Sequence, residues 1–317
     1  MSTVRYFRWD DPGAPTLTGE VGSLTNLLRK CLVGTAGVAY GSKPAAGWSE
    51  AFAGTATNIA VFRNNSADGG SGCYVRVNDN ASGAGGAREA QIAVYGSMTD
   101  INSGTMGTSA LWFRKSGTAD ATARKWQVVA DGRTAWLHSY EISAALSGNG
   151  FDTSLAGIGD YACVDAANAF RYFCMGRATV NSNFGGDIVA LGGSSPSSNS
   201  AAFSVQSLDG ISGLKQPSIL RPMIIADGGV GGTEYPAPPH PITGDTYFLS
   251  HPPIRDGGML LGRLRGIRLP YHNIMSTADG AEFSGYTGQR VAKTRITTNS
   301  NANHSVGILL DAVGPWP

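Results

Sequence analysis

Paired carboxylates are the first residues in this sequence that could do chemistry. A glycoside hydrolase needs two carboxyl groups about 5–10 Å apart across a sugar cleft. The aspartates considered for such a pair are Asp100, Asp120, Asp131, Asp160 and Asp165. Most of them stand in turn-like contexts, where an aspartate side chain commonly bonds nearby backbone. No spacing brings a chosen pair together, so the sequence favours a protein that is not an enzyme, with glycan hydrolysis as the alternative.

Histidines and cysteines show neither metal-ligand nor redox spacing. No two histidines lie within four residues of each other, and no two cysteines form a C-x-x-C pair. We therefore expect no metal ion, no cofactor and buried free thiols, although a disulfide between Cys163 and Cys174 remains conceivable. The residues concerned are His138, His240, His251, His272, His304, Cys31, Cys73, Cys163 and Cys174.

Two familiar glycine motifs are also missing. No G-x-x-x-x-G-K-[ST] phosphate loop and no G-x-S-x-G nucleophile elbow occurs in the chain. The glycine-rich stretch 228–232 lacks the following lysine and a helical continuation, so we interpret it as a loop.

Tryptophans are the best sequence clue to ligand binding. Sugar-binding surfaces present exposed aromatic rings, whereas large aromatic residues on strands more often belong to a core. Trp48, Trp112 and Trp136 lie on or beside expected strands. Core packing is the favoured role for each, and these three are the candidates for facing a glycan if an exposed surface binds one.

Composition excludes several classes of protein. The chain has 317 residues with a net charge of +1, and only 15% of its residues are charged. This charge balance gives no electrostatic footprint for nucleic acid. No run of 18 apolar residues would span a membrane, and Met1 to Trp9 lacks the apolar core of a signal peptide. We expect synthesis in a cytoplasm, with neither nucleic-acid binding nor membrane insertion.

One helix is predicted, at about residues 23–33. Apolar residues at 24, 27, 28, 31 and 32 follow the i, i+3, i+4, i+7, i+8 pattern of a buried helix face. Ser23 is the expected N-terminal cap, and Gly34 is the residue expected to end the helix.

Most other segments predict β-strands. Short runs rich in β-branched and aromatic residues alternate with clusters of Gly, Asn, Ser and Asp. Strands are expected at 4–9, 59–63, 73–78, 89–95, 111–115, 222–226, 246–250, 259–264, 291–296 and 306–310. In the strand at 73–78, Val75 and Val77 should point to one face and Arg76 to the other.

Two hairpins are predicted. Strands 125–130 and 133–140 flank Asp131-Gly132, a pair typical of a type I′ turn with positive φ angles. Trp136 and His138 should share one face of the second strand. A further hairpin is expected from 161–164 to 170–175, with its turn at 165–168.

The expected fold is mainly β, with antiparallel sandwich or barrel-like domains and one short N-terminal helix. The small-residue stretch at 192–201 suggests a linker or a long surface loop. We therefore expect a β-rich attachment body at 1–190, a Ser/Gly-rich linker or loop at 191–214, and a β-rich C-terminal region at 215–317.

Three segments make the chain resemble structural proteins of tailed bacteriophages. The first runs from Val4 to Gly19, followed by the helical segment and Gly47-Trp48. The second comprises Ser97–Thr105 and Lys115–Trp126. The third is Leu264–Pro270 together with the ending Gly314-Pro315-Trp316.

The resemblance implies a virion protein, assembled in the bacterial host's cytoplasm and packed against copies of itself and other virion proteins. A structural role in the tail or baseplate region is the leading expectation. A capsid decoration, collar or neck protein is the first alternative. A fibre or spike module that binds a host receptor or surface glycan is the second, although the chain has neither coiled-coil nor repetitive shaft.

Overall fold

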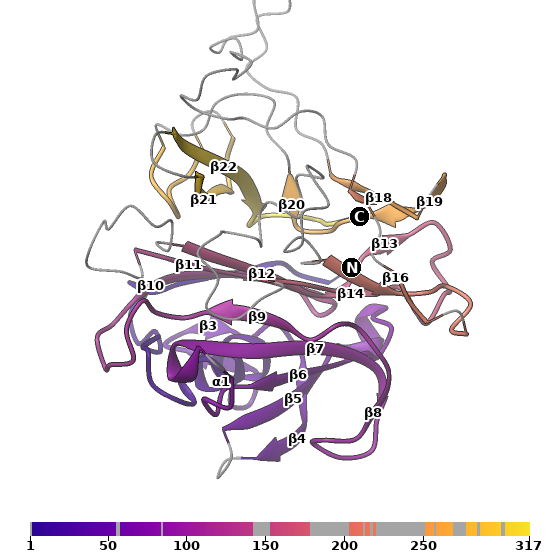
Figure 1. Cartoon of the computed structure of the whole chain (residues 1–317), viewed down its shortest axis with the longest axis horizontal. Helices are drawn as coiled ribbons and strands as arrows, with labels where there is room; N and C mark the ends of the chain where they lie inside the picture. Colours follow the sequence, from indigo (N-terminus) through magenta and orange to yellow (C-terminus); the bar gives the residue numbers. More distant parts are fainter. Residues whose placement is uncertain are drawn as a thin grey trace, which may run out of the picture.

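The computed structural model describes residues 2–54, 58–83, 85–141, 153–177, 203–211, 213–215, 218–219, 251–256, 258–268, 277–283, 286–298 and 302–317. Their strands stack in three layers, and both chain termini lie on the same side of the molecule (Figure 1). The chain is mainly β with antiparallel sheets and one short N-terminal helix, as predicted. No helix in this described part is long and apolar enough to span a membrane.

The central sheet is the middle layer, and all of its strand pairs are antiparallel. Its strands, in spatial order, are β1 (Arg5–Arg8), β10 (Lys125–Ala130), β11 (Thr134–Tyr140), β12 (Thr153–Asp160), β14 (Tyr172–Met175), β15 (Phe203–Gln206) and β16 (Leu214–Lys215).

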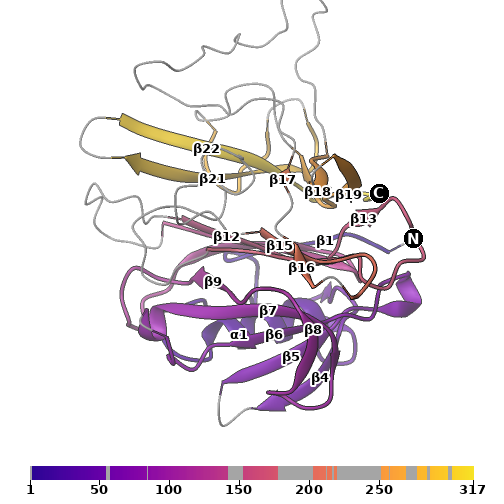
Figure 2. The same ribbon diagram turned by 45° about the vertical axis from the view of Figure 1, so that its right-hand side comes forward.

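The outer sheet forms the layer next to it and is built from strands within residues 49–114 (Figure 2). Its strands are β4 (Ser49–Gly54), β5 (Ile59–Arg63), β6 (Tyr74–Asn78), β7 (Glu89–Met98) and β8 (Gly104–Gly107), with β9 (Leu111–Arg114) also paired to β7.

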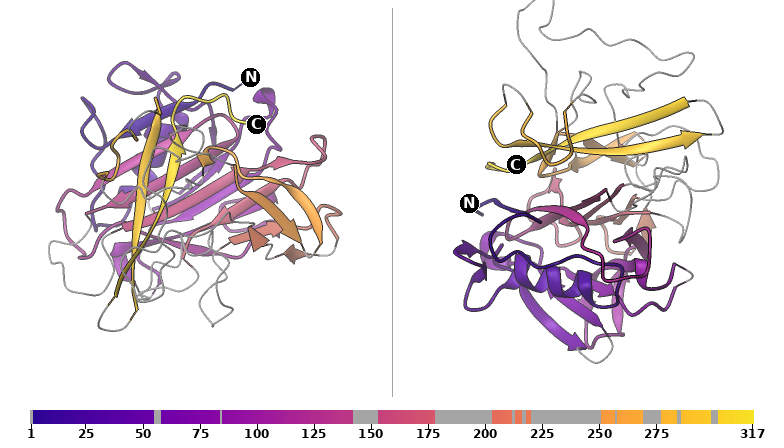
Figure 3. Two further views of the ribbon diagram at one scale, coloured as in Figure 1. Left: turned by 90° about the horizontal axis from the view of Figure 1, so that it is seen from above. Right: turned by 90° about the vertical axis from the view of Figure 1, so that its left-hand side faces the viewer.

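The C-terminal layer covers the other face of the central sheet (Figure 3). One of its two sheets contains β20 (Ile267–Arg268), β22 (Ala302–Asp311) and β21 (Gln289–Thr298). The other contains β13 (Ala162–Cys163), β19 (Met259–Arg263), β18 (Pro253–Asp256) and β17 (Ser218–Ile219).

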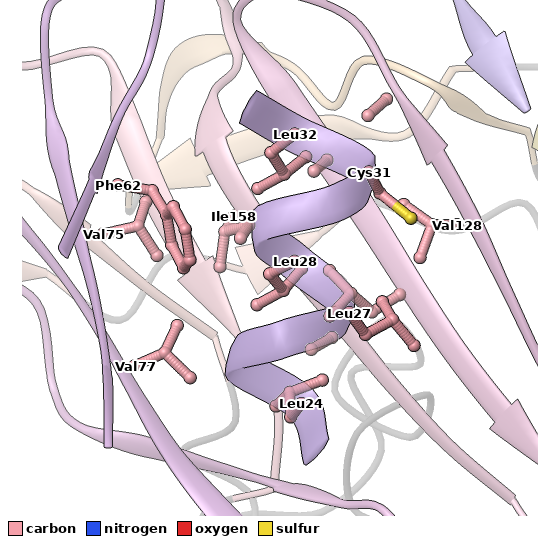
Figure 4. Close-up of a cluster of buried hydrophobic side chains, with 14 of the residues drawn as sticks. Leu24, Leu27, Leu28, Cys31, Leu32, Phe62, Val75, Val77, Val128 and Ile158 are labelled. Carbon is pink, nitrogen blue, oxygen red and sulfur yellow. The ribbon is translucent and has the colours of Figure 1, made fainter. Parts of the chain in front are cut away.

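The helix lies between the outer and central sheets. It comprises α1 (Ser23–Leu28) and a π-helical turn, η1 (Arg29–Val33), which ends at Gly34 as expected. Its apolar face meets Phe62 of β5 and Ile158 of β12 in one buried cluster (Figure 4). Short strands β2 (Val38–Tyr40) and β3 (Lys43–Pro44) follow, and single 3-10 turns occur at Ser66–Asp68 and Gly86–Arg88.

The prediction that Ser23 caps the N-terminus of this helix is wrong. The Ser23 hydroxyl donates to the carbonyl of Thr18 instead of capping the helix. The carboxylate of Asp79, which follows β6, accepts the N–H of Leu24 at 2.8 Å. A carboxylate distant in the sequence thus satisfies a free N–H group of the first turn, which local sequence could not indicate.

The hairpin of β10 and β11 is confirmed, but its turn is not type I′. Neither Asp131 nor Gly132 has a positive φ. Asp131 Oδ1 accepts the N–H groups of Arg133 and Thr134, both at 2.9 Å, and this side-chain turn needs no left-handed residue. Glycine is needed at position 132 for a different reason: the carboxylate of Asp68 lies so close to the backbone that a Cβ would be 2.2 Å from it.

The second predicted hairpin is displaced. The expected turn at 165–168 is present, because the N–H of Asn168 donates to the carbonyl of Asp165 at 3.1 Å. The preceding strand that pairs with β14 is β12, with Asp160 opposite Tyr172, and not the segment 161–164. Cys163 lies on β13, which pairs with β19 in the C-terminal layer. Distant residues 259–263 therefore provide the partner that the sequence assigned to the neighbouring strand.

The boundary expected between two bodies falls within the central sheet. β15 and part of β16 fall inside the expected linker at 191–214, yet they complete the central sheet. Residues of the C-terminal layer, such as Ile254 and Ile308, share one buried cluster with Val129 and Trp136 of the central sheet. The small-residue stretch 192–201, the glycine-rich loop 228–232 and the strands expected at 222–226 and 246–250 lie outside the described residues.

Asp311, fully buried at the end of β22, joins the three strands of its sheet. Its carboxylate accepts hydrogen bonds from Arg268 of β20 at 3.0 Å and from Gln289 of β21 at 2.9 Å. Burial alone would raise the pKa of this carboxyl. The N–H of Gly314 and the Arg268 guanidinium outweigh burial, so the pKa is lowered.

Asp311→Asn is expected to reduce the free energy of unfolding at pH 7 by about 1–3 kcal/mol, because it removes a charged acceptor from buried donors. A lowered folded pKa stabilises the protein above the unfolded value of about 3.9, and that contribution is lost as pH falls through the folded pKa. Urea unfolding at several pH values should show the gap from wild type shrinking below about pH 4. A gap that stays constant down to pH 3 would contradict this assignment.

Candidate functional site

Four of the five candidate aspartates confirm the turn role, and one of them, Asp131, closes the β10–β11 turn described above. Asp100 Oδ1 accepts the N–H of Asn102, Asp120 Oδ1 that of Thr122, and Asp165 Oδ1 that of Ala167. Hydrogen bonds lower the pKa of both Asp100 and Asp120, so these two carboxyls favour the ionised form.

Asp131 and Asp160 are buried and serve the structure. Arg265 Nη2 lies 2.7 Å from Asp131 Oδ2 and so fastens the C-terminal layer to the central hairpin. Asp160 accepts from Asn64 Nδ2 at 2.9 Å and from the Ser71 hydroxyl at 2.6 Å, linking the central and outer sheets. Burial raises the pKa of Asp160, although the hydrogen bonds from Ser71 act to lower it.

The histidines do not converge on a site in the described part. His138 is fully buried, its Nδ1 lies 3.0 Å from Gln127 Nε2, and its ring stacks on Tyr140. His251 Nδ1 lies 3.1 Å from the carbonyl of Ile267. His240 and His272 lie outside the described residues, as does the side chain of His304. Among the side chains that are described, no three of His, Cys, Asp or Glu gather into a metal site.

All four cysteines are free thiols, and three of them are buried. Cys163 is half-buried on β13, whereas Cys174 is buried on β14 in a different sheet. The conceivable disulfide between them is therefore absent. Burial raises the pKa of Cys31, Cys73 and Cys174, which favours the unreactive thiol over the thiolate.

Two of the three candidate tryptophans are core residues, the role that the sequence favoured for each, and they do not face a glycan. Trp48 is 4% exposed, and its indole N–H donates to the carbonyl of Asp131 at 2.7 Å. Trp136 is fully buried, and its N–H donates to the carbonyl of Arg265 at 2.7 Å. Each ring can be buried between layers because its one polar group, the indole N–H, has a backbone acceptor there that is distant in the sequence.

Trp112 is the exception, because it is only half-buried. It lies on β9 directly opposite Gln91 of β7, and therefore on the face of the outer sheet that points away from the core. Its ring passes close to the chain at Gly83, where a Cβ would lie 2.2 Å from the indole. The surrounding loop thus covers part of this ring.

The same face of the outer sheet carries a group of aromatic and arginine side chains that we call the aromatic face: Phe52, Arg63, Tyr74, Arg76 and Tyr95. They come from four adjacent strands, β4 to β7. Arg63 is exposed, and the other four are half-buried. None of its three rings belongs to a described core cluster, so core packing does not explain them.

Tyr74 is the centre of this group. Its ring stacks on Phe52 at a centroid distance of 6.3 Å and an interplanar angle of 22°. Arg63, paired with Tyr74 across β5 and β6, places its guanidinium carbon 5.0 Å from the Tyr74 centroid. The ring and the cation therefore hold each other in place.

Tyr95 lies directly opposite Tyr74 on β7, and β8 is shaped to receive its ring. A Cβ at Gly104 would lie 2.5 Å from the Tyr95 ring, and one at Gly107 would lie 2.7 Å from it. Only glycine allows the phenol ring to lie so close to the β8 backbone. The sequence around these two glycines thus fixes the orientation of Tyr95.

Arg76 is held by the loop between β7 and β8. Its Nε donates to the carbonyl of Ile101 at 2.8 Å, and its Nη2 donates to Asn102 Oδ1 at 3.0 Å. Within the described part of the chain, neither Arg63 nor Arg76 forms an ion pair with a carboxylate. The aromatic face therefore presents two cationic groups that form no ion pair among the described residues.

Comparison with known proteins gives no assignment. No family model matches the chain, and no curated protein matches it. The function must therefore be argued from the surfaces of the chain itself.

A second surface carries exposed apolar side chains, and we call it the apolar patch: Val164, Met259 and Leu260. Val164 is 62% exposed, Met259 56% and Leu260 41%. The N–H of Val164 donates to the carbonyl of Leu261 at 2.9 Å, so the segment after β13 lies beside β19. Met259 and Leu260 begin β19, and β13, β18 and β19 lie together in Figure 2.

The aromatic face was missed by sequence reasoning, which concentrated on tryptophan. Its signal is nevertheless present, because Tyr74 and Arg76 alternate with the inward-pointing Val75 and Val77, whose burial confirms the predicted alternation. An aromatic residue and an arginine on the solvent side of a strand could have indicated this surface. Its other members could not be placed beside them without the strand order.

Proposed function

We propose that this chain is a non-enzymatic structural protein of a tailed-bacteriophage virion, located in the tail or baseplate region. It acts by packing against copies of itself and against other virion proteins. The segments that resemble phage structural proteins support this class. The described residues add three stacked β layers joined by buried ion pairs, an architecture that a structural protein could use.

The apolar patch is the observation that carries the proposal. Val164, Met259 and Leu260 expose apolar side chains at neighbouring backbone positions of one sheet, with Met259 and Leu260 pointing to opposite faces of β19. Exposed apolar side chains close together are typical of a surface that another protein covers. The strand beside them, β13, has only two residues, which limits uncontrolled pairing at that edge. The patch therefore offers side-chain contact more than an open strand to a neighbouring subunit.

Incorporation into particles tests the patch. A Met259→Lys, Leu260→Lys variant should fold with a stability within about 0.5 kcal/mol of wild type, because both residues are at the surface. It should enter particles at least about tenfold less, because charges would replace apolar contacts in the interface. Mass spectrometry of purified particles, relative to the major capsid protein, measures the loss.

Val38→Lys is the matched control, since Val38 is 43% exposed but lies on β2, away from the patch. It should enter particles normally. Equal incorporation of all three proteins would overturn the patch as the assembly surface.

The location of this chain in the virion is tested by cryo-EM of the intact particle, with the chain traced into the density. Density at the tail or baseplate supports the proposal. Density on the capsid surface, collar or neck overturns the tail assignment and favours the alternative of a decoration or neck protein.

A further inference from the structure

We propose that the aromatic face binds an acidic oligosaccharide, a chain of sugars that carry carboxylate groups. This ligand is distinct from the protein partners proposed for the apolar patch. The two proposals use different residues and are tested separately.

Ring geometry is the first argument. A pyranose ring has an apolar C–H face and a rim of hydroxyl groups, so it packs on the flat face of an aromatic ring while its rim stays hydrated. Tyr74 and Tyr95 lie opposite each other on neighbouring strands, with Phe52 stacked on Tyr74. Three aromatic side chains on adjacent strands offer a surface wide enough for more than one sugar unit.

Charge is the second argument, and it selects the acidic class. Arg63 and Arg76 flank Tyr74 on the same face, and a guanidinium group binds a carboxylate through two parallel N–H bonds. The two acids on the strands of this sheet are paired with other cations: Glu50 with Arg29, and Glu89 with Arg114 and Arg177. The strands therefore place positive charge on the aromatic face, with Asp100 as the one acid in the loop beside Arg76, and this charge complements an anionic sugar.

Preorganisation is the third argument. The Tyr95 ring is seated on two glycines, Tyr74 contacts the Phe52 ring and the Arg63 guanidinium, and Arg76 is fixed by the Ile101 carbonyl. Side chains held in this way lose little conformational freedom when a ligand binds.

Isothermal titration of the purified full-length chain tests the proposal. The probes are short oligomers of galacturonic acid, of sialic acid and of alginate, with a neutral galactose oligomer for comparison. We expect at least one acidic oligomer to bind, and the neutral oligomer to bind at least about tenfold more weakly. No binding of any acidic probe at millimolar concentration would overturn the proposal, as would equal binding of the neutral one.

Two variants test whether the acidic oligosaccharide binds at the aromatic face. Arg63→Gln changes an exposed residue and should leave folding intact, while Tyr95→Ala removes a half-buried ring. Each should weaken binding of the acidic oligomer at least about tenfold. Trp9→Ala is the matched control, because Trp9 is an exposed aromatic with Lys125 5.4 Å from its ring centroid, yet it follows β1 of the central sheet and lies outside the aromatic face.

Two results would overturn the assignment even if a sugar binds. One is unchanged affinity in the Arg63→Gln variant. The other is a dimer of the wild-type chain, seen by light scattering, that Tyr95→Ala converts to a monomer, because the face would then be covered by a second copy. Particle incorporation of the Met259→Lys, Leu260→Lys variant tests the apolar patch alone and has no bearing on sugar binding by the aromatic face.

Discussion

Replacing Lys115 with methionine should reduce the free energy of unfolding by about 3–5 kcal/mol, because it leaves a buried carboxylate without its cation. Lys115 and Asp79 are both fully buried, and the Lys115 ammonium contacts Asp79 Oδ1. The same ammonium donates to the carbonyl of Glu20 at 2.6 Å. Burial raises the pKa of Asp79 and lowers that of Lys115, so each charge depends on the other.

The position of this pair explains the size of the expected effect. Asp79 follows β6, Lys115 follows β9, and Asp79 also accepts the N–H of Leu24 at the start of α1. One ion pair thus joins the helix to the ends of two strands. Methionine preserves the volume of the lysine stem, so the measured change reports the lost charge rather than a cavity.

Urea unfolding measures this loss of stability, and two further variants show whether it comes from the unpaired buried charge. Lys125→Met removes a partly exposed ion pair with Glu141 and should cost less than about 1 kcal/mol. Adding Asp79→Asn to Lys115→Met should recover part of the loss, because no buried charge then remains unpaired. A loss below about 1 kcal/mol for Lys115→Met alone would show that water reaches Asp79.

The pH dependence provides a second signature. In the Lys115→Met protein, the folded pKa of Asp79 should rise further, because burial acts without the opposing cation. A raised carboxyl pKa means that the unfavourable buried charge is relieved as pH falls through that value. The stability difference from wild type should therefore shrink on acidification, whereas a structural defect of other origin would persist.

Local patterns were enough to predict several elements of this fold, although not strands such as β4 and β12. The 3.6-residue spacing of Leu24, Leu28 and Leu32 gave the helix, and alternation gave the inward direction of Val75 and Val77. The β10–β11 hairpin was predictable because its two strands are joined by a short polar turn. Each of these features depends on residues that are near one another in the sequence.

Features that depend on distant residues were predicted wrongly or missed. Asp131 closes its turn through its own carboxylate, which is held by Arg265, 134 residues later. The small residues before β15 suggested a linker, because nothing local shows that Phe203 pairs opposite Met175 in the central sheet. The aromatic face needs the order of four strands, which no spacing in the sequence specifies.

The third layer is the largest of these features, and Trp136 shows why it could not be predicted. Alternation correctly separates Trp136 and His138 from Ala135 and Leu137 on β11. A strand with one apolar and one mixed face normally turns the mixed face to solvent. Here both faces are buried, because strands from the end of the chain cover the second one.

Trp136→Ala is accordingly expected to destabilise the protein by about 3–5 kcal/mol, the cost of deleting a large buried aromatic side chain. The ring packs against Phe173 at a centroid distance of 5.5 Å, and its N–H donates to Arg265 at the boundary with the C-terminal layer. Unfolding in urea measures the loss. Trp9→Ala, at a 40% exposed tryptophan, is the control and should change stability by less than about 1 kcal/mol.

Gly157 turns this prediction into a test of the packing itself. It lies directly opposite Trp136 on β12, and a Cβ there would lie 2.4 Å from the indole ring. Gly157→Ala alone should therefore cost about 1–3 kcal/mol by overpacking. In the Trp136→Ala background the new methyl group enters the cavity, so the same change should cost little or be stabilising. Additive effects in this double-mutant cycle would show that the ring does not lie over Gly157, and with it that the interface between the central sheet and the C-terminal layer is packed differently.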